Sequence, residues 1–572
     1  MGLIGALNIG RTGLTVNQAA MEVVGNNLAN AASESYNRQS PIITPNIGQE
    51  LAPGLFVGTG VKFAGIVRHA DEALLARLRL AISDRAGTGA QYELLSQIEA
   101  IQNELTDQGL SNRLTEFFNT WSQLANNPTD NSLRVLVIQG GRALTEFVNR
   151  MQRDLVAVRN QLDDTMRATA VTANGLLDRI AELNGAIANA EAGAGGANAL
   201  RDDRDRLLVE LSEIVDISTV EQTSGVVDVF VGSIPIVLAG QNRGLDLSFE
   251  SEGDDLTVRL RVAADGEILQ PTSGKLGLML QAREQDVNSA VQALNDFAAH
   301  LIFQVNRVHS QGQGTEAFDD LTATYAVDDT AAALTLADAG LEFTPEHGSF
   351  MLHVTQQSTG TRVTTRIDVD LDGLGGADMS LEDLRDAINA DPTVGPMVTA
   401  SITTEGRLNI TANSPDDQFS FSDDTSGVLA ALGLNTFFAG KDGADIAVND
   451  VLIDTPARLA VGLEHVVGDN RSALAIVGLN DQSLDALGGI SLPAFWSRHI
   501  EDMAIRTSAA QQAVEADQVI VESLEAQRQA ISGVDIDEET INLLAYQRAF
   551  QGSARFISAV DEMLSTLLGL LR

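Results

Sequence analysis

The sequence contains no cysteine, and this absence excludes several kinds of chemistry at once. Disulfide bonds, thiolate metal sites and cysteine nucleophiles all require that residue. Aromatic residues make up only 4% of the 572 residues. No run of about 18 consecutive apolar residues occurs, so we expect no membrane-spanning helix and no membrane as a partner.

Positive charge is also scarce. The chain has 37 lysines and arginines against 78 aspartates and glutamates, and its formal net charge is −41. Such a chain is repelled by phosphate backbones, so we expect no nucleic acid as a partner. The N-terminal segment "MGLIGALNIGRTGLTVNQ" lacks the basic start and continuous apolar stretch of a cleaved signal peptide.

Motifs for catalysis or cofactor binding are missing too. The sequence has no G-x-S-x-G, no P-loop, no G-x-G-x-x-G and no HExxH, so we predict no catalytic, cofactor-binding or metal-binding residues. The seven histidines show no ligand spacing and are expected to be ordinary surface or core residues; they are His69, His300, His309, His347, His353, His465 and His499.

One segment has the opening of a calcium loop. "DVDLDGLGGADM" (368–379) begins Asp-x-Asp-x-Asp-Gly, but Met379 stands where an EF-hand has a bidentate glutamate. A strand-like segment, "TRVTTRI", precedes it where an EF-hand has a helix. We therefore expect a strand that ends in an acidic turn at Asp368–Asp372.

The chain divides into three zones by pattern. Up to about residue 200, apolar residues recur at alternating spacings of three and four, for example from Leu144 to Leu162, which predicts helices. Segments rich in β-branched residues follow from near Val215, then a helical run, and then a β-rich block from 312 to about 469. Residues 316–469 contain 27 acidic and 6 basic residues, which favours a separate, solvated domain. From about Leu492 the pattern is helical again.

Both ends of the chain carry apolar seams with heptad spacing. Such a seam needs a partner, because isolated helices are marginal in water. The alternative is that two ordinary amphipathic helices pack on a globular core. Three asparagines also lie where the first helix should end. They could cap the helix, or they could form hydrogen bonds with neighbouring subunits. The predicted assembly interface comprises Leu3, Leu7, Leu14, Met21, Val24, Asn26, Asn27, Leu28, Asn30, Tyr36, Arg38, Leu543, Tyr546, Phe550, Ile557, Val560, Leu564, Leu567 and Leu571.

The two ends also resemble a known family. "GNNLANAASESYNRQS" (25–40) resembles the N-terminal signature of the flagellar axial proteins, the family of rod, hook and hook-associated proteins. "SGVDIDEETINLLAYQRAFQGSARFISAVDEMLSTLLGLL" resembles the matching C-terminal signature, and "FFNTWSQLANNPTDNSLR" looks like the interior of the hook-associated members. Ser35 departs from the glycine usual before the tyrosine. In the acidic block, "MSLEDLRDAINA" resembles a short repeat of flagellins.

This resemblance implies a multi-domain, discontinuous α+β fold. Residues 1–60 plus 530–572 would form a terminal helical coiled-coil inner domain, with the N- and C-terminal helices paired. Residues 61–311 plus 480–529 would form a helical bundle with β-strands, and 312–479 an acidic, β-rich outer domain.

The function implied is that of a structural subunit, not an enzyme, in a ring between hook and filament that filament assembly requires. The subunit would be exported unfolded by the flagellar type III apparatus without a cleaved signal peptide, and would be extracellular. The partners implied are further copies of the chain, the hook protein, the second junction protein, the filament cap protein and an export chaperone on the C-terminal helix. No cofactor is implied.

Two alternatives stay open. Within the family, the chain could be the second junction protein, a hook protein or a distal rod protein. Outside it, a secreted hydrolase with coiled-coil ends could use the carboxylate pairs Asp416–Asp417 or Asp423–Asp424.

Overall fold

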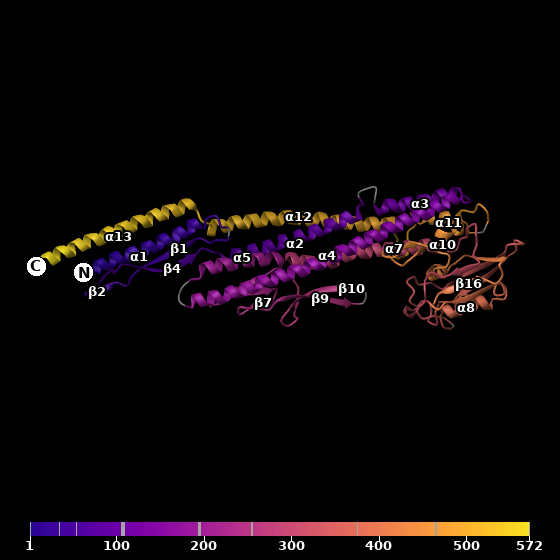
Figure 1. Ribbon diagram of the computed structural model, residues 1–572, viewed down its shortest axis with the longest axis horizontal. Helices are drawn as coiled ribbons and strands as arrows, with labels where there is room; N and C mark the ends of the chain where they lie inside the picture. Colours follow the sequence, from indigo (N-terminus) through magenta and orange to yellow (C-terminus); the bar gives the residue numbers. More distant parts are fainter. Residues whose placement is uncertain are drawn as a thin grey trace. The chain divides into compact units, whose positions relative to one another are not determined.

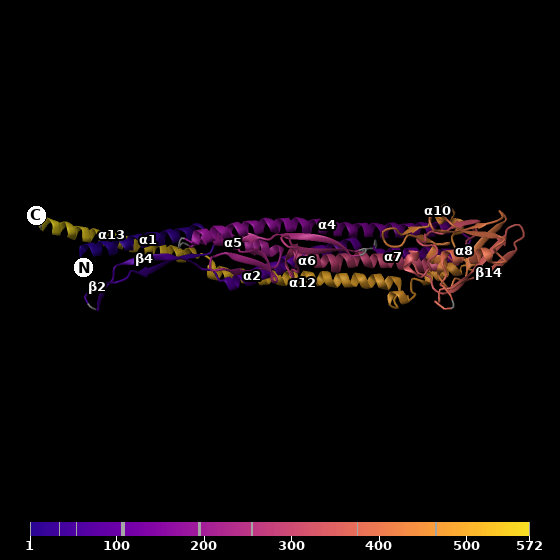
Figure 2. The ribbon, with the colours of Figure 1, turned by 90° about the horizontal axis from the view of Figure 1, so that it is seen from below.

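The computed structural model describes residues 2–33, 35–52, 54–104, 109–192, 196–252, 255–374, 376–463 and 466–570. The chain forms two compact units, and each is discontinuous in sequence (Figures 1 and 2). Unit 1 comprises residues 1–94, 162–284 and 508–572, and unit 2 comprises residues 95–161 and 285–507. Three long helices contribute residues to both units: α2 (Glu72–Gln102), α4 (Asn131–Glu191) and α12 (Leu492–Ser532).

Unit 1 contains both terminal helices and all the described strands that precede residue 284. Its elements, besides parts of the three shared helices, are α1 (Leu3–Ala29), β1 (Gln39–Pro45), β2 (Gln49–Ala52), β3 (Leu55–Val57), β4 (Val61–Arg68), α5 (Asn198–Ile214), β5 (Ser218–Glu221), β6 (Val227–Val231), β7 (Ile234–Leu238), β8 (Gln241–Asn242), β9 (Leu245–Glu252), β10 (Asp255–Val262), β11 (Ile268–Leu269), α6 (Gly274–Ala282) and α13 (Ile536–Leu570). A π-helical turn, η1 (Arg283–Val287), joins α6 to the next helix in unit 2.

Strands occur in the N-terminal zone, where the sequence was expected to be helical. β1 pairs antiparallel with β4, and β2 pairs with β3. The prediction of a helical zone up to residue 200 is therefore wrong for residues 39–68. β-branched residues occur in both β1 and β4, and the prolines of β1 fit a two-stranded sheet in which each strand has a free edge.

The helical patterns further along are confirmed. α4 runs unbroken over 61 residues, and the apolar positions Leu176, Ile180 and Ile187 within unit 1 are buried. Beside this helix, β5 to β8 form a four-stranded sheet in sequence order, and β9, β10 and β11 form a three-stranded sheet.

Unit 2 combines helices with the acidic block. Its elements are α3 (Leu110–Asn126), α7 (Asn288–His309), β12 (Asp320–Thr322), η2 (Ala337–Ala339), β13 (Gly348–Gln356), β14 (Arg362–Val369), α8 (Leu381–Ala390), β15 (Val398–Ile402), β16 (Leu408–Ala412), β17 (Asp417–Ser422), α9 (Val428–Leu432), β18 (Phe438–Ala439), β19 (Ala447–Val448), α10 (Asp450–Asp454), η3 (Pro456–Arg458), α11 (Arg471–Gly478) and η4 (Asp485–Leu487).

The acidic block has a hydrophobic core of its own. β13 is the central strand of the sheet β14-β13-β17, and β16 is the central strand of β12-β16-β15. One cluster of buried residues extends from Phe318 to Leu434 and includes Phe350, Phe419 and Phe421. The block is therefore β-rich, as its sequence predicts, and buries enough apolar area to hold its strands together.

A second group of aromatic side chains lies between the helices of unit 2. Phe117 and Trp121 of α3 contact Phe437, with ring centroids 5.6 and 5.4 Å apart, respectively. His309, the last residue of α7, is fully buried beside Trp121. The segment that follows the core of the acidic block is thus part of the helical packing.

The chain is a mixed helix-and-strand protein, 55% helical and 18% strand, which confirms the predicted class at that level. The division into three domains predicted from the sequence stays a prediction.

Candidate assembly interface

The two terminal helices of unit 1 run antiparallel against each other (Figures 1 and 2). Near one end of the pair, Asn27 of α1 bonds Glu539 of α13. Further along, a Cβ placed on Gly10 would lie 2.5 Å from Cγ1 of Ile557. The two backbones approach so closely there that any side chain larger than glycine requires a shift.

The start of α13 is fixed by a capping carboxylate. Oδ1 of Asp535 accepts the backbone N–H groups of Asp537 and Glu538, at 2.9 and 3.1 Å. Three acidic residues occupy the first turn, where the helix dipole favours negative charge. The break between α12 and α13 predicted at 531–540 is confirmed.

The predicted seam on α13 faces α1 of the same chain. Of its members, Val560 is buried and Leu567 is exposed. The others are half-buried: Leu543, Tyr546, Phe550, Ile557 and Leu564. Leu571 lies outside the described residues. On α1, Val24 is buried and the other apolar members are half-buried: Leu3, Leu7, Leu14, Met21 and Leu28. The seams therefore cover each other within one chain.

The amide of Asn27 is buried at the end of α1. Its Nδ2 donates to the backbone oxygen of Gln39 at 2.8 Å and to Oε2 of Glu539 at 2.9 Å. Its Oδ1 accepts from the Gln39 N–H at 3.1 Å and from the Tyr36 hydroxyl at 2.8 Å. Burial, with the nearby negative charges of Asp202 and Glu539, raises the pKa of Tyr36 to about 12.

The other two asparagines lie nearer the surface. Asn30 ends the helix, and its Nδ2 donates to the backbone oxygen of Asn26 at 2.9 Å and to the Asn26 Oδ1 at 2.8 Å. These bonds fit the capping interpretation. The side chain of Asn26 is exposed, so it has space for a further partner.

Arg38 ties β1 to the junction between α12 and α13. Its guanidinium lies 2.9 Å from Glu538 and 2.9 Å from the buried Glu539, and its backbone N–H donates to the Ser532 oxygen at 2.8 Å. Burial disfavours the charged guanidinium, but the two carboxylates outweigh it and raise the pKa of Arg38. Arg38 thus binds the start of α13, which is 501 residues away in the sequence.

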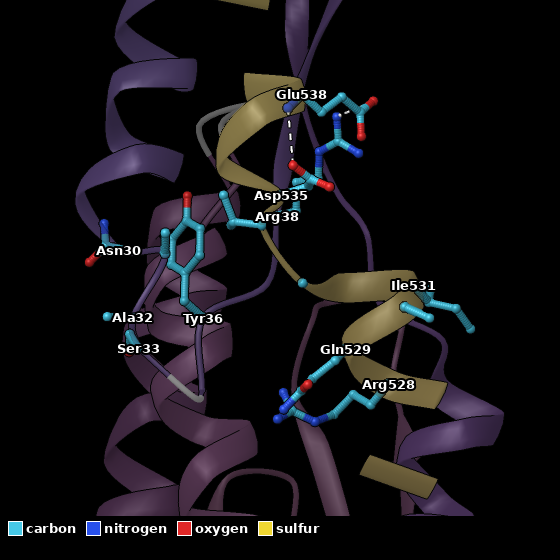
Figure 3. A pocket seen from close by; sticks show the side chains of 14 residues that line it. Asn30, Ala32, Ser33, Tyr36, Arg38, Arg528, Gln529, Ile531, Asp535 and Glu538 are labelled. Atoms are coloured by element: carbon cyan, nitrogen blue, oxygen red, sulfur yellow. Dashed lines mark hydrogen bonds and ion pairs between the residues drawn. The ribbon is translucent and has the colours of Figure 1, made fainter. Parts of the chain in front are cut away.

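A cavity of about 620 Å³ opens beside this junction (Figure 3). The loop after α1, the end of α12 and the start of α13 all contribute to its wall, which is mainly polar. Arg38, Asp535 and Glu538 supply its charges from one side, and Arg528 from α12 supplies another. The wall of the cavity thus carries charges of both signs.

Asn37 anchors the same loop to α5 within unit 1. Its Nδ2 donates to Oδ1 of Asp202 at 2.6 Å, and Arg68 pairs with Asp202 and Asp205 at 3.0 and 2.8 Å. Burial raises the pKa of Asp202, although the bonds from Asn37 and Arg68 oppose the shift. Sequence reasoning missed this anchor, and no local spacing links residue 37 to residue 202.

A second apolar face of α13 remains exposed, and sequence reasoning missed it as well. Ile541 is 66% exposed and Met563 is 50% exposed. The set comprises Ile541, Leu544, Phe556 and Met563. Successive residues of a helix are about 100° apart around its axis. Ile541 precedes the first seam residue, Leu543, by two positions, so it lies on a different face of α13. Apolar residues on two faces are the signal that identifies a helix covered on more than one side.

Other parts of the N-terminal region also expose apolar side chains. Ile4 of α1 is 72% exposed, and exposed apolar side chains also lie in and around the β1–β4 segment: Ile42, Ile43, Ile47, Phe56, Ile66 and Val67. Large apolar side chains exposed in such number favour protein contact in this region.

Outside this region, the acidic turn expected after β14 is confirmed, and two aspartates lie near His347. β14 ends at Val369, and Asp372 then accepts the Leu374 N–H at 2.7 Å in the turn that follows. The sequence showed no ligand group beside His347, but the structure brings Asp370 and Asp372 to it. The pairing of β13 with β14 brings these residues together, and their spacing in the sequence does not reveal it.

Three family models match parts of the chain. The "Flagellar hook-associated protein FlgK helical domain" matches residues 95–319. The "Flagellar basal body rod FlgEFG protein C-terminal" matches residues 525–570, which include α13, and the "Flagellin hook IN motif" matches residues 354–414 in the acidic block. These matches define the class, a flagellar axial protein.

Relatives that match along their full length indicate which kind of flagellar axial protein the chain resembles. The chain is 24% identical over 577 residues to flagellar hook-associated protein 1 of Escherichia coli (strain K12), with 99% of each chain covered. It is 25% identical to the protein of the same name from Bacillus subtilis (strain 168), with 98% and 97% covered. The chain is similar over its full length to flagellar hook-associated protein 1, and the helical-domain model of that family matches its middle part. This is a structural flagellar family and not an enzyme family, so neither the hydrolase nor another axial protein is favoured.

A solved structure shows the same fold. The flagellar hook junction protein FlgK from Burkholderia pseudomallei matches with a TM-score of 0.50 at 15% identity, covering 80% of this chain and 100% of that one. Among the described residues, no helix combines the length and the apolar character that crossing a membrane requires.

Proposed function

We propose that this chain is a structural subunit at the junction between the flagellar hook and filament, where it forms a ring that filament assembly requires. The observation that carries this proposal is the match over 99% of the chain to a hook-associated protein 1. A chain that matched only the terminal signatures would fit any flagellar axial protein equally well.

In this proposal, α1 and α13 pair as a coiled coil and form the inner domain. Their antiparallel contact at Gly10 and Ile557, together with the three–four spacing of the seam, supports this pairing. The domain comprises residues 1–60 plus 530–572. Residues 61–311 plus 480–529 surround it, and residues 312–479 form the outer domain, supported by a separate hydrophobic core.

Neighbouring copies of the chain bind the second face of α13 in the ring. α1 and α13 already bury each other's seam residues. The exposed side chains of Ile541 and Met563 can therefore still be buried by a neighbouring copy. Removing one such side chain from water contributes about 1.5–3 kcal/mol, and every subunit of a ring repeats that gain. The predicted interface residues of the seam support this surface by holding the two helices together.

The remaining partners follow from the family. The hook protein and the second junction protein bind on the two sides of the ring, and the filament cap protein is present during assembly. An export chaperone binds the C-terminal helix, whose apolar rows would otherwise be exposed before assembly. The subunit is exported without a cleaved signal peptide and resides in the extracellular part of the flagellum.

Two matched substitutions on α13 test the ring contact. Ile541→Asp places a charge on the exposed face, and Ile557→Asp places one on the seam. We expect Ile541→Asp to leave the melting temperature of the monomer unchanged and to abolish filaments when it replaces the native subunit in cells. Burying an unpaired carboxylate costs several kcal/mol in each contact.

Ile557→Asp should instead loosen the α1–α13 pair already in the monomer, as measured by protease cleavage within residues 3–29. Normal filaments with Ile541→Asp, in a subunit exported at native levels, would show that this face makes no essential contact.

A further inference from the structure

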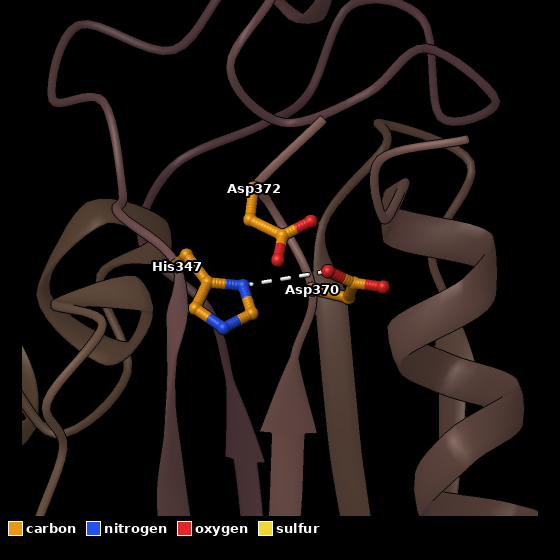
Figure 4. A group of neighbouring side chains, drawn as sticks. All are labelled: His347, Asp370 and Asp372. Carbon is orange, nitrogen blue, oxygen red and sulfur yellow. Dashed lines mark ion pairs between the residues drawn. The ribbon is translucent and has the colours of Figure 1, made fainter. Parts of the chain in front are cut away.

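His347 is brought beside two aspartates by strand pairing in unit 2. In the antiparallel pair β13–β14, Gly348 is opposite Val369. The residue before β13 and the residue after β14 are therefore neighbours, which places His347 next to Asp370 (Figure 4). Asp372, two residues further along the turn, lies beside the same two side chains.

The ligand atoms of these three side chains lie within metal-binding range. One atom from each of His347, Asp370 and Asp372 lies within 4.8 Å of the other two. Nδ1 of His347 is 3.4 Å from Oδ1 of Asp370. Two ligands of a tetrahedral ion with bonds of about 2.1 Å are about 3.4 Å apart, so this pair already has the separation that one ion requires.

The orientation of the histidine also fits a ligand. Nδ1 of His347 faces the turn that carries both aspartates, because the backbone N–H of Leu371 in that turn donates to it at 3.3 Å. A hydrogen bond of this length is weak, and an ion bound to Nδ1 would replace it.

Among the described residues, no arginine or lysine neutralises the two carboxylates. Within the described ranges, neither Asp370 nor Asp372 forms an ion pair with an arginine or lysine, whereas the neighbouring Asp368 pairs with Arg366 at 2.7 Å. His347 and Asp370 are each about half exposed, so an ion can enter and keep water as its remaining ligands.

We propose that His347, Asp370 and Asp372 bind one divalent transition-metal ion of the zinc class, with water completing the coordination. An imidazole nitrogen with two carboxylates suits zinc or cobalt, whereas calcium takes oxygen ligands only. Such an ion would cross-link the segment before β13 to the turn after β14.

Cobalt absorption tests the proposal on the full-length chain. After treatment with EDTA and removal of the chelator, the protein is titrated with Co²⁺, and its visible d–d bands are recorded. We expect saturation at one equivalent, with displacement by Zn²⁺ and not by Ca²⁺. His347→Gln and Asp372→Asn should each weaken binding at least about tenfold.

The matched control is Asp368→Asn, which removes a neighbouring carboxylate that Arg366 already neutralises. It should bind cobalt like the native chain. Zinc should also raise the melting temperature of the native chain and not that of His347→Gln, whose folding is checked by circular dichroism. The proposal is overturned by no saturable binding, by unchanged binding in His347→Gln, by equal loss in Asp368→Asn or by displacement with calcium.

Discussion

The amide of Asn27 makes four hydrogen bonds, which is the full capacity of an asparagine side chain. Two of them join α1 to Gln39 at the start of β1, and the others reach Glu539 and Tyr36. An aspartate has the same shape but no N–H group, so it cannot donate to Glu539. Asparagine therefore satisfies these partners without adding a second buried negative charge.

We expect Asn27→Asp to destabilise the contact between α1 and α13 by roughly 2–5 kcal/mol, because it removes two donors and sets a carboxylate against Glu539. Thermolysin cleavage of the terminal helices, followed by mass spectrometry, measures this loss. Asn26→Asp is the control on the exposed side of the same turn. Equal cleavage in the two variants would show that the buried amide contributes nothing special.

His309 is neutral because of where it lies. It is fully buried, its Nδ1–H donates to the Asn435 oxygen at 2.8 Å, and its Nε2 accepts the Ala460 N–H at 3.0 Å. Burial, opposed by the Asn435 bond and helped by the positive charge of Arg134, lowers the pKa of His309 to about 4. Burial likewise lowers the pKa values of His353 and His499 to about 4.

These three histidines predict a stability that falls in mild acid. An unfolded histidine takes up a proton below its ordinary pKa of 6.5, whereas the buried one stays neutral until about pH 4. The free energy of unfolding of unit 2 should thus be fully present above pH 6.5 and decrease as the pH falls towards 4.

Urea unfolding between pH 7.5 and 4.5, followed by tryptophan fluorescence from the two tryptophans in unit 2, measures this decrease. His309→Gln should be less stable at neutral pH and show a shallower decrease. A native chain whose stability does not change between pH 7.5 and 5 would contradict the assignment.

At the scale of elements, the close approach of α1 and α13 depends on a glycine. Gly10→Ala would place a methyl group 2.5 Å from Ile557, which forces the helices apart. On the same helix, Gly25 has nothing within 4 Å of its Cβ position, so Gly25→Ala should stabilise α1 by up to about 1 kcal/mol through helix propensity alone.

We expect Gly10→Ala to destabilise the α1–α13 pair, although it raises the helix propensity of α1 by the same amount. Hydrogen exchange of the α1 amides separates the two, with faster exchange in Gly10→Ala and slower exchange in Gly25→Ala. Slower exchange in both variants would mean that the seam has room for the methyl group.

The long helices could be predicted because their evidence is local. The three–four spacing in α4 and the cap at Asp535 lie within a few residues of the elements they define. The strands between 39 and 68 were missed because they are short and interrupted by prolines and glycines, and because their pairing partners lie about 20 residues away.

The contacts of the candidate interface were only partly predictable. The family signatures include Asn27 and Arg38, but their partner Glu539 is more than 500 residues away. The bond from Asn37 to Asp202 and the approach of His347 to Asp370 likewise depend on tertiary structure. One sequence without pairing information does not contain these distances.

At the scale of the whole molecule, the core of the acidic block is formed by one continuous segment, which contacts α7 where Phe343 stacks on Phe303. Its buried cluster ends at Leu434, and Asn435 then donates to the Gly312 oxygen at 2.9 Å. The chain can therefore be rejoined there by a short glycine–serine loop that replaces residues 313–434. Phe437 must stay, because it covers Phe117 and Trp121.

We expect this deletion to fold, to be exported and still to join hook to filament, because the proposed ring contacts lie on the terminal helices. A deletion of 312–469, which also removes Phe437, is the comparison and should unfold the helices around Trp121. Motility and the far-ultraviolet circular dichroism of both variants are measured. Loss of filaments with a folded, exported 313–434 deletion would assign assembly contacts to the acidic block.

The role at the hook–filament junction is tested most directly by electron microscopy of cells that lack this chain, together with an assay for filament protein in the medium. The proposed role predicts hooks without filaments, filament protein released into the medium, and recovery of filaments when the native chain is supplied again. Filaments of normal length on the hooks of cells without the chain would contradict it.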